Sequence, residues 1–363
     1  MPEDRDIRVC EIANTPVECS SEKTVLRQQD GEASPRQALL EVKDLEVTYG
    51  SGRKAFKAVN RANFEIYKGE TFGLVGESGS GKTTIGRAIM RILPTSGGEI
   101  LYKGQKINGK ISRQLDQQVI KEIQMIFQDP QSSLNERAKV SYIVGEGLQN
   151  VRPDLTAAQR EEKVRQALLD VGLLPEFASR FPHEFSGGQR QRIGIARTLA
   201  LQPKLLIADE AVSALDVSVQ AQIINLLEEL QKSLHLTMLF ISHDLSVVRC
   251  MTDRAVVMYL GKIMEMGPTE HLFGAPAHPY TRNLIDAVPE PDPDCPAKES
   301  TMIGEPPSPM DIPGGCRFHP RCPYAKNVCR RAQPELTDLG GGHFAACHFP
   351  YACAGVPQTE AEQ

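Results

Sequence analysis

A glycine-rich run in this 363-residue chain has the residue types and the spacing of a phosphate-binding loop. The run, GESGSGKT at residues 76–83, lies between an apolar segment and a stretch of helical pattern. Glycines allow backbone N–H groups to converge on phosphate oxygens, and the following helix adds the positive end of its dipole. We expect Lys82 to reach the β- and γ-phosphates of a nucleoside triphosphate and the Thr83 hydroxyl to bind Mg²⁺. The other residues assigned to this site are Gly76, Ser78, Gly79, Ser80, Gly81 and Thr84.

Two adjacent carboxylates follow a second apolar run. Residues 205–208 are apolar and predict a buried strand that ends at Asp209 and Glu210. The C-terminal ends of such strands are where α/β sheets bind ligands. We expect Asp209 to hold Mg²⁺ through a water molecule and Glu210 to polarise the attacking water. An acidic strand end can also cap a helix, but the phosphate-binding loop in the same chain favours the catalytic interpretation.

The segment FSGGQ, residues 185–189, is a second candidate for anion binding because a predicted helix follows it. A serine hydroxyl and bare backbone N–H groups at a helix start can bind phosphate. One triphosphate does not need two such devices, so we expect this one to serve ATP held by another subunit. On its own the segment could also be a flexible loop. The residues concerned are Ser186, Gly187, Gly188 and Gln189.

The elements around these motifs predict an α/β fold. Residues 39–50 and 58–70 alternate apolar and polar side chains, which is typical of half-buried antiparallel strands, and residues 255–267 predict a hairpin. Residues 161–172 and 218–232 have the apolar faces of helices. Buried strands that alternate with helices predict a mostly parallel sheet covered on both faces. Four short apolar runs are the expected buried strands, at residues 71–76, 123–128, 205–209 and 237–243.

Composition limits the functional classes. Hydrophobic and charged contents of 40% and 24% are ordinary for globular proteins, and the net charge of -5 argues against nucleic-acid binding through global positive charge. No stretch approaches the roughly 20 apolar residues that span a bilayer. Residues 1–23 lack the apolar region of a secretory signal. We therefore expect a cytosolic chain.

These motifs together resemble those of the ABC ATPase family. The loop at 76–83 is similar to its Walker A motif and LLIADE to its Walker B motif, with Ala211 where proline commonly follows the glutamate. FSGGQ is similar to the signature, with Phe185 in place of the usual leucine. SALD at 213–216 resembles the D-loop that ends in Asp216. Three single residues match further family positions: Gln128 the Q-loop glutamine, His243 the switch histidine, and Tyr49 the aromatic that stacks on adenine.

The resemblance implies a P-loop NTPase of ABC type, with a mostly parallel sheet core, an antiparallel β subdomain and a helical subdomain at about 129–185. It further implies two such domains that face each other head to tail with two ATP molecules between them. Glu210, His243 and Gln128 are then the catalytic residues, and the partner contributes its signature and D-loop. Hydrolysis is expected to need dimerisation.

Soluble ABC proteins and transporter subunits differ in their organisation. Soluble proteins of translation carry two ATPase units in tandem, and those of DNA maintenance insert long coiled coils, whereas this chain has a single phosphate loop and no heptad repeat. QDPQSSLNERAKV after Gln128 and HPYTRNLI at 278–285 are similar to the oligopeptide/dipeptide branch of ABC importers, although Glu136 replaces the usual proline.

Membership of that branch would bring several partners. The resemblance implies a second, related ATPase subunit, two membrane permeases, an extracytoplasmic solute-binding protein and no nucleic acid. It places the chain at the cytoplasmic face of the inner membrane as a peripheral subunit. The solute stays open, because relatives carry peptides, nickel, opines or sugars.

Four late cysteines, Cys316, Cys322, Cys329 and Cys347, lie on segments rich in proline and glycine. Four thiolates suit a tetrahedral metal or an iron–sulfur cluster, although the close cysteine pairs of zinc ribbons are missing. Nearby His319, His343 and His348 could replace a thiolate in a zinc site, and unrelated cysteines are the remaining alternative. The resemblance to the oligopeptide/dipeptide branch implies a [4Fe–4S] cluster, with zinc as the alternative.

The domain organisation follows from these patterns. We predict a flexible N-terminal tail at 1–37, an ABC ATPase domain at 38–270 and an oligopeptide-type C-terminal region with the cysteines at 271–363. Proline-rich sequence after about residue 288 marks the linker into a small cysteine-rich extension.

Overall fold

The computed structural model of the chain describes residues 37–52, 55–129, 133–213, 215–288, 302 and 304–352. The tail predicted at 1–37 lies outside these ranges except for its last residue. The proline-rich linker and Ala214 of the predicted D-loop are outside them too, apart from a few linker positions.

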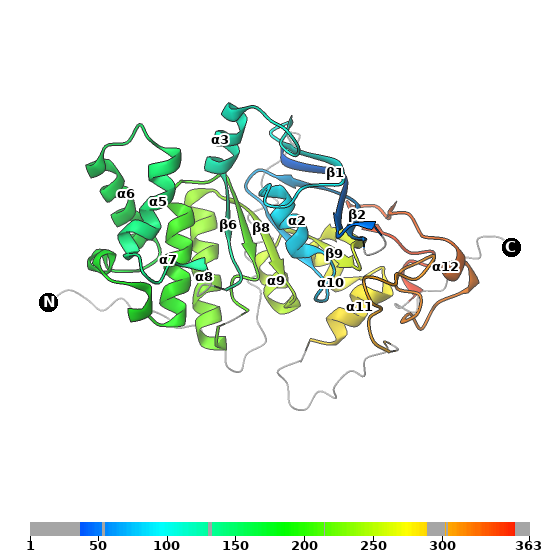
Figure 1. Cartoon of the computed structure of the whole chain (residues 1–363). Helices are drawn as coiled ribbons and strands as arrows, with labels where there is room; N and C mark the ends of the chain where they lie inside the picture. The colour runs from blue at the N-terminus through cyan, green and yellow to red at the C-terminus, as the bar shows by residue number, and fades with distance from the viewer. Residues whose placement is uncertain are drawn as a thin grey trace, which may run out of the picture.

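A large central sheet organises the described part of the chain (Figure 1). It has eight strands in the order β11-β12-β10-β9-β3-β8-β7-β6. The strands from β9 to β6 pair in parallel, and those from β10 to β11 are antiparallel. The parallel strands are β3 (Thr71–Val75), β6 (Ile123–Ile126), β7 (Leu205–Asp209), β8 (Thr237–Ser242) and β9 (Arg254–Tyr259). The others are β10 (Lys262–Pro268), β11 (Thr337–Asp338) and β12 (Phe344–Ala345).

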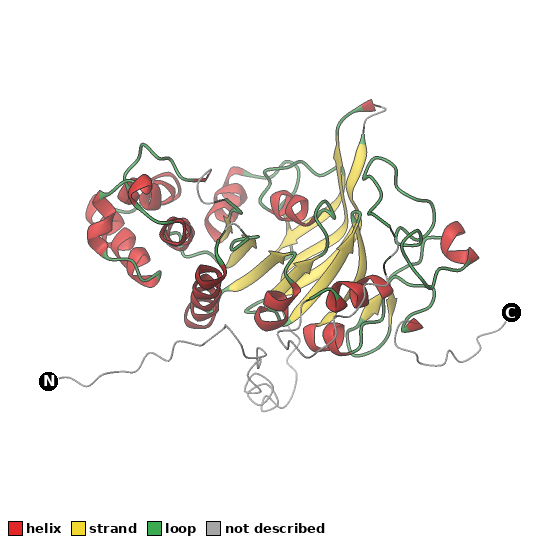
Figure 2. Ribbon diagram, turned by 90° about the horizontal axis from the view of Figure 1, so that it is seen from below, coloured by secondary structure: helices red, strands yellow, loops and turns green. Residues whose placement is uncertain are grey.

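Every residue of β3, β7 and β8 is buried, which confirms the prediction of buried strands. Helices lie on both sides of the sheet, as Figure 2 shows. Alternate residues of one strand therefore enter different hydrophobic clusters. On β7, Leu206 and Ala208 belong to one cluster, and Leu205 and Ile207 belong to the other.

A second, antiparallel sheet has the order β2-β1-β4-β5. Its strands are β1 (Ala38–Tyr49), β2 (Phe56–Tyr67), β4 (Gly97–Tyr102) and β5 (Gln105–Lys106). The predicted alternation holds on β1, where Leu40 and Val42 are buried and then Leu45 and Val47. The pattern slips by one residue between the two pairs because the register shifts there, next to Asp44 with its positive φ of 45°.

Helices α5 (Val140–Val151), α6 (Ala157–Asp170) and α7 (Gly187–Leu199) pack together as a helical lobe at one end of the molecule (Figure 1). Helix α6 begins at a capping box formed by Thr156 and Gln159. It ends at Asp170 with Val171 as the C-cap, and Gly172 after it has a φ of 71°, the left-handed conformation that commonly ends a helix. The short 3₁₀ turns η2 (Pro175–Ser179) and η3 (Pro182–Glu184) lead from α6 into α7.

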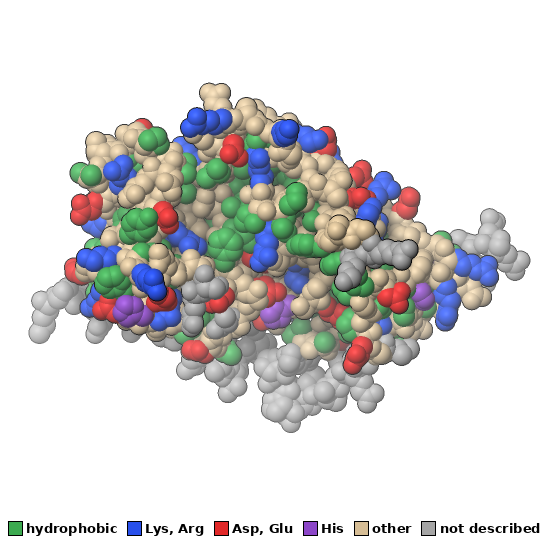
Figure 3. All heavy atoms as spheres, viewed as in Figure 1, with side chains coloured by type: hydrophobic (Ala, Val, Ile, Leu, Met, Phe, Trp, Pro, Cys, Tyr) green, Lys and Arg blue, Asp and Glu red, His purple; other side chains and the backbone are tan. Residues whose placement is uncertain are grey.

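The described part of the chain contains further helices outside the helical lobe. They are α2 (Lys82–Ile89), α3 (Arg113–Glu122), α8 (Val217–Leu234), α9 (Leu245–Met251), α10 (Thr269–Gly274), α11 (Pro279–Asp286) and α12 (Asn327–Arg331). None of the helices in the described ranges is both long enough and apolar enough to span a membrane. On the face shown in Figure 3, basic and acidic side chains are interspersed.

A buried carboxylate fastens the C-terminal segment to the central sheet. Glu265 on β10 is fully buried and accepts hydrogen bonds from the backbone amides of Ala277 (2.7 Å) and His278 (3.0 Å). His343 Nε2 lies 2.7 Å from the same carboxylate. Because β12 also pairs with β10, residues near 343 are held at the sheet edge by both backbone and side-chain bonds.

Candidate functional site

The predicted phosphate-binding loop follows β3 and leads into α2. Glycine is required at two of its positions. A Cβ on Gly76 (φ 146°) would lie 2.1 Å from the Met258 carbonyl oxygen, and one on Gly81 (φ 104°) would lie 2.5 Å from that of Ala58. Helix α2 begins at Lys82, inside the phosphate-binding motif, and no side chain caps its N-terminus. Its first amides are thus not engaged by a capping side chain and can serve an anion.

Lys82 places a positive charge inside this loop. Its side chain is almost fully buried, and Nζ donates hydrogen bonds to the carbonyl oxygens of Gly76 (2.7 Å) and Glu77 (2.9 Å). Burial lowers the pKa of Lys82, and the nearby carboxylates of Glu210 and Asp209 oppose that change. Nζ also lies 3.5 Å from Ser80 Oγ. The loop backbone therefore holds the ammonium group in place.

Thr83 and Asp209 come together from the loop and from the end of β7. The Thr83 hydroxyl donates to Asp209 Oδ1 at 2.8 Å, although 126 residues separate the two. Asp209 is 2% exposed, and burial raises the pKa of its carboxyl group. The pairing of Val75 with Ser242 and of Asp209 with Ile241 brings the ends of β3, β8 and β7 level. This alignment explains why the motifs converge.

The three predicted catalytic residues meet at Glu210. Gln128 donates from Nε2 to Glu210 Oε2 at 2.7 Å, and His243 Nδ1 lies 3.4 Å from Oε1. Glu210 has a positive φ of 46°, which is unusual for a residue with a side chain, and its amide donates to the Ile241 carbonyl oxygen (2.9 Å). Such strained positions concentrate at functional sites.

The remaining residues assigned to the nucleotide site surround this centre. Tyr49 ends β1, and its hydroxyl lies 3.4 Å from Thr84 Oγ1 on α2. The Tyr49 ring stacks on Phe56 with centroids 5.8 Å apart, so the aromatic expected for adenine has a protein neighbour on one face. Ser78 and Gly79 form the exposed tip of the loop.

The predicted signature residues lie at the start of α7, in the helical lobe. Ser186 is the N-cap, with a capping box in which its hydroxyl accepts from the Gln189 amide (3.4 Å). This contact leaves the hydroxyl hydrogen able to donate. Gly188 allows α7 to approach α8, because a Cβ there would lie 2.5 Å from Val219 Cγ1. Ser186 and Gly187 are exposed, as is Asp216, the N-cap of α8.

The signature and the phosphate loop belong to different parts of the molecule. Helix α7 packs against α5, α6 and α8, whereas α2 packs against β2 and β7. The two helices are set apart in Figure 1. The exposed signature residues therefore face outward from the lobe, where a second molecule can reach them.

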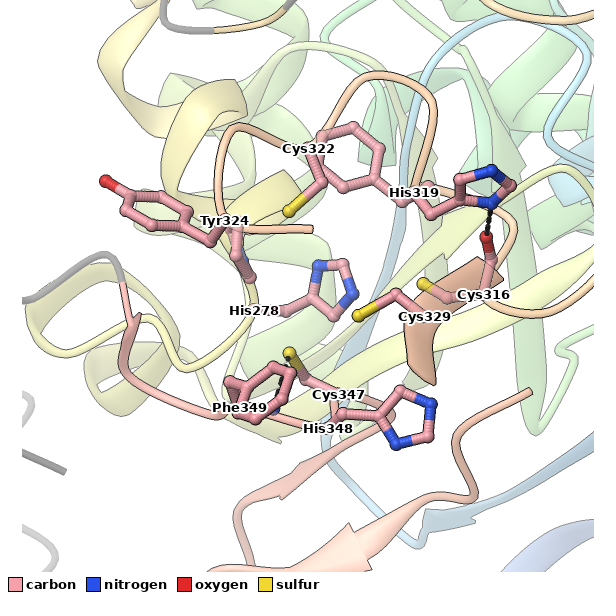
Figure 4. A pocket seen from close by; sticks show the side chains of 11 residues that line it. His278, Cys316, His319, Cys322, Tyr324, Cys329, Cys347, His348 and Phe349 are labelled. Atoms are coloured by element: carbon pink, nitrogen blue, oxygen red, sulfur yellow. Dashed lines mark hydrogen bonds between the residues drawn. The ribbon is translucent and has the colours of Figure 1, made fainter. Parts of the chain in front are cut away.

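The four late cysteines line one pocket, and Figure 4 shows their side chains around a common space. Burial raises the pKa of the Cys347 thiol to about 12, and the other three cysteines raise it as well. In the part of the chain that the structure describes, no group of three or more candidate ligands is arranged to hold a metal ion. The lining includes Cys316, Cys322, Cys329, Cys347, His278, His319, His348 and Phe318.

The histidines considered as zinc ligands differ in position. His319 and His348 line the pocket, and each has a ring nitrogen beside a backbone carbonyl oxygen, of Cys316 (2.9 Å) and Ala332 (3.0 Å). His343 is instead engaged with Glu265 and is not part of the lining.

One group of residues at the phosphate loop is not indicated by any sequence pattern. Arg321 and Tyr280, from the C-terminal segment, both contact Glu77. Tyr280 lies in HPYTRNLI, which indicated a family but not a contact. The separations of 203 and 244 residues from Glu77 leave no local pattern that could have revealed the pairing.

Comparison with known proteins decides the family. Residues 59–213 match the model of the ABC transporter family, and residues 264–329 match that of the oligopeptide/dipeptide transporter C-terminal region. Over 268 residues the chain is 59% identical to the oligopeptide transport ATP-binding protein AmiF of Streptococcus pneumoniae, a match that covers 74% of this chain and 87% of AmiF. The chain belongs to the ABC transporter ATP-binding proteins.

A second curated relative and a solved structure extend the comparison. This ABC ATPase is 49% identical over 326 residues to the oligopeptide transport ATP-binding protein AppF of Bacillus subtilis, which covers 87% of this chain and 99% of AppF. The dimeric cassette MJ0796, solved in a post-hydrolysis state with ADP and Pi, aligns with a TM-score of 0.58 and 27% identity, over 63% of this chain and 98% of that one. The predicted P-loop NTPase fold of ABC type is confirmed, and the chain is an ATPase that acts on ATP with Mg²⁺.

Proposed function

We propose that this ABC ATPase powers the import of peptides through a membrane transporter. The observation that supports this most strongly is the match of residues 264–329 to the oligopeptide/dipeptide transporter C-terminal region. AmiF and AppF are both named as oligopeptide transport ATP-binding proteins, which also supports a role in peptide import. A soluble ATPase of translation or DNA maintenance transports no solute and is not expected to carry that transporter region.

The geometry supports a division of roles within the ATP site. Lys82 and the amides of the loop would bind the phosphates, and Thr83 and Asp209 would hold Mg²⁺. Glu210 would orient and polarise the attacking water, with Gln128 and His243 beside its carboxylate, and His243 would stabilise the charge that develops. The binding residues are Tyr49, Gly76, Ser78, Gly79, Ser80, Gly81, Lys82, Thr83, Thr84, Gln128 and Asp209.

The second half of each ATP site comes from a facing subunit. Ser186, Gly187, Gly188 and Gln189 of the signature contact the partner's nucleotide, together with Asp216 of the D-loop. The exposure of Ser186, Gly187 and Asp216, the separation of α7 from the phosphate loop of the same chain and the dimeric state of MJ0796 support this arrangement. We propose a related but different ATPase as the partner, as in the oligopeptide branch.

The rest of the assembly follows from the transporter function. We propose two permease subunits that dock on the helical lobe, an extracytoplasmic solute-binding protein, and a location at the cytoplasmic face of the inner membrane. The matching division of the chain is an ATPase domain at 38–270, with its helical subdomain at about 129–185, and a C-terminal region at 271–363.

Deletion of the gene for this chain is expected to abolish uptake of a radiolabelled oligopeptide by the source cells. A plasmid copy of the wild type should restore uptake, because the transporter needs this subunit for ATP hydrolysis. The Lys82→Ala copy should not restore it, whereas Lys110→Ala, which changes an exposed lysine away from the loop, should. Undiminished peptide uptake in the deletion strain would contradict the peptide substrate.

We further propose that Cys316, Cys322, Cys329 and Cys347 hold a [4Fe–4S] cluster. The donor set fits, since four thiols line one pocket of the described chain. A cluster binds each thiolate to a different iron atom and needs no convergence on one point, whereas a single zinc ion does. Among the described residues no group of three or more ligands is gathered around one metal ion, so the proposal rests on the four thiols of the pocket and on the family resemblance. When bound, the cluster would supply folding energy to a loop-rich segment.

Full-length protein purified without oxygen is expected to contain about four iron and four sulfide ions per chain and to absorb near 400 nm. Cys329→Ser should lower the iron content, because it removes one of the four thiolates. Cys250→Ser is the matched control, since this cysteine is on α9 outside the pocket. Colourless protein with one zinc per chain would contradict the cluster.

A further inference from the structure

The C-terminal segment contacts the phosphate loop directly. Arg321 Nη1 donates to both carboxylate oxygens of Glu77, at 2.9 and 3.1 Å. The Glu77 amide in turn donates to the Tyr280 hydroxyl at 3.0 Å. Glu77 is the second residue of the loop, so both its backbone and its side chain are bonded to residues that follow the ATPase motifs in the sequence.

These contacts are shielded from water. The Arg321 side chain is 7% exposed and that of Glu77 is 24% exposed, while Tyr280 is fully buried. A charge pair in such surroundings is screened less than a surface pair, and loss of one partner leaves the other charge poorly solvated. The pair is therefore expected to affect the loop more strongly than an exposed salt bridge would.

Packing fixes the Arg321 side chain in this position. Its guanidinium lies over the Tyr259 ring, 5.8 Å from the centroid, and its Nη1 also reaches the Tyr259 hydroxyl at 3.4 Å. Tyr259 packs against Tyr280 and Phe318, with centroids 4.8 and 5.5 Å apart. Phe318 also lines the cysteine pocket, so one aromatic cluster joins that pocket to the phosphate loop.

The position of Glu77 bears on the position of Lys82. The Glu77 carbonyl oxygen accepts a hydrogen bond from Lys82 Nζ, as does that of Gly76. A shift of Glu77 would move one of the two acceptors that hold the ammonium, together with the adjacent amides of the loop. Pre-organised donors bind an anion more tightly than donors that must first be ordered.

We propose that Arg321 is a positioning residue that holds the phosphate loop in its nucleotide-binding conformation through Glu77. The inference rests on the ATP site proposed above and adds to it a residue from the C-terminal region. The cysteine-bearing segment thereby supports nucleotide binding as well as its own fold.

Arg321→Ala is expected to weaken binding of MgADP and of a non-hydrolysable MgATP analogue by about tenfold, since tenfold corresponds to about 1.4 kcal/mol. The KM for ATP of the assembled transporter should rise similarly, while kcat changes by less than about threefold, because Arg321 does not touch the reacting atoms. Arg321→Lys keeps the charge and should recover part of the affinity. Arg330→Ala, an exposed arginine of the same segment, should bind nucleotide like the wild type.

Glu77→Ala removes the same ion pair from the other side and leaves the C-terminal segment unchanged. It should weaken nucleotide binding to a similar extent, and the double variant should be no weaker than either single one. Additive losses in the double variant would overturn the inference. So would wild-type affinity in Arg321→Ala, or a lower melting temperature with unchanged affinity and KM. Wild-type protein that binds no nucleotide would instead overturn the proposed ATP site, and the inference with it.

Discussion

Glu210→Gln is expected to reduce ATP turnover at least about hundredfold while ATP still binds. A positioned carboxylate that activates water contributes roughly 10²–10⁴ to a rate, and glutamine has nearly the same shape without the basic oxygen. Gln128 and His243 both contact Glu210, so the carboxylate sits at the centre of the site and not at its margin. The phosphate contacts of Lys82 are left intact, so bound ATP should accumulate.

Two measurements check this expectation. Steady-state phosphate release by the assembled transporter gives the turnover, and light scattering with ATP present should show that the variant traps ATP-bound dimers. Glu161→Gln makes the same chemical change on the exposed face of α6 and should behave like the wild type. Turnover by Glu210→Gln at the wild-type rate would remove Glu210 from the role of water activation.

Lys82→Ala is expected to weaken nucleotide affinity by about hundredfold or more. A hydrogen bond to a charged group contributes roughly 1.5–3 kcal/mol, and a hundredfold loss of affinity corresponds to about 2.7 kcal/mol. The ammonium lies in the middle of the loop, where hydrogen bonds to two backbone carbonyl oxygens hold it at the expected phosphate site. Alanine leaves the loop without that charge beside the carboxylates of Asp209 and Glu210.

The Lys82→Ala variant is expected to lose nucleotide affinity while its thermal stability changes little. Titration with MgADP measures the lost affinity, and thermal unfolding without nucleotide should change little, because burial already disfavours the charged lysine, as its lowered pKa indicates. Lys110→Ala, which is exposed, is the control for both measurements. An unchanged dissociation constant for Lys82→Ala would contradict the assignment of this loop to phosphate binding.

Sequence patterns predicted the fold and most of the site because the governing interactions there are local. Apolar runs had to become buried strands, so β3, β7 and β8 were found at their expected places. The convergence of Thr83 with Asp209 also followed, since parallel strands bring their C-terminal ends to one edge. Differences include the end of β6, which stops at Ile126 where the apolar run extended to residue 128, and the register shift of β1 next to Asp44.

Pairings between distant segments were beyond the reach of sequence patterns. The family resemblance named Gln128, Glu210 and His243 separately, but only the fold shows Gln128 and His243 beside one carboxylate, that of Glu210. Likewise, the sequence suggested His343 as a metal ligand, whereas the structure gives it a partner in the buried Glu265.

The sequence by itself thus determined the motifs of an ABC ATPase, because the roles of their glycines, carboxylates and apolar runs depend on residues that are close in the chain. Only the tertiary structure shows that the C-terminal segment contacts the phosphate loop. The contact is the ion pair between Arg321 and Glu77, which are 244 residues apart. No periodicity or propensity encodes such a contact. It arises when segments that are far apart in the sequence pack together and bury opposite charges between them, and only the folded chain defines which segments meet.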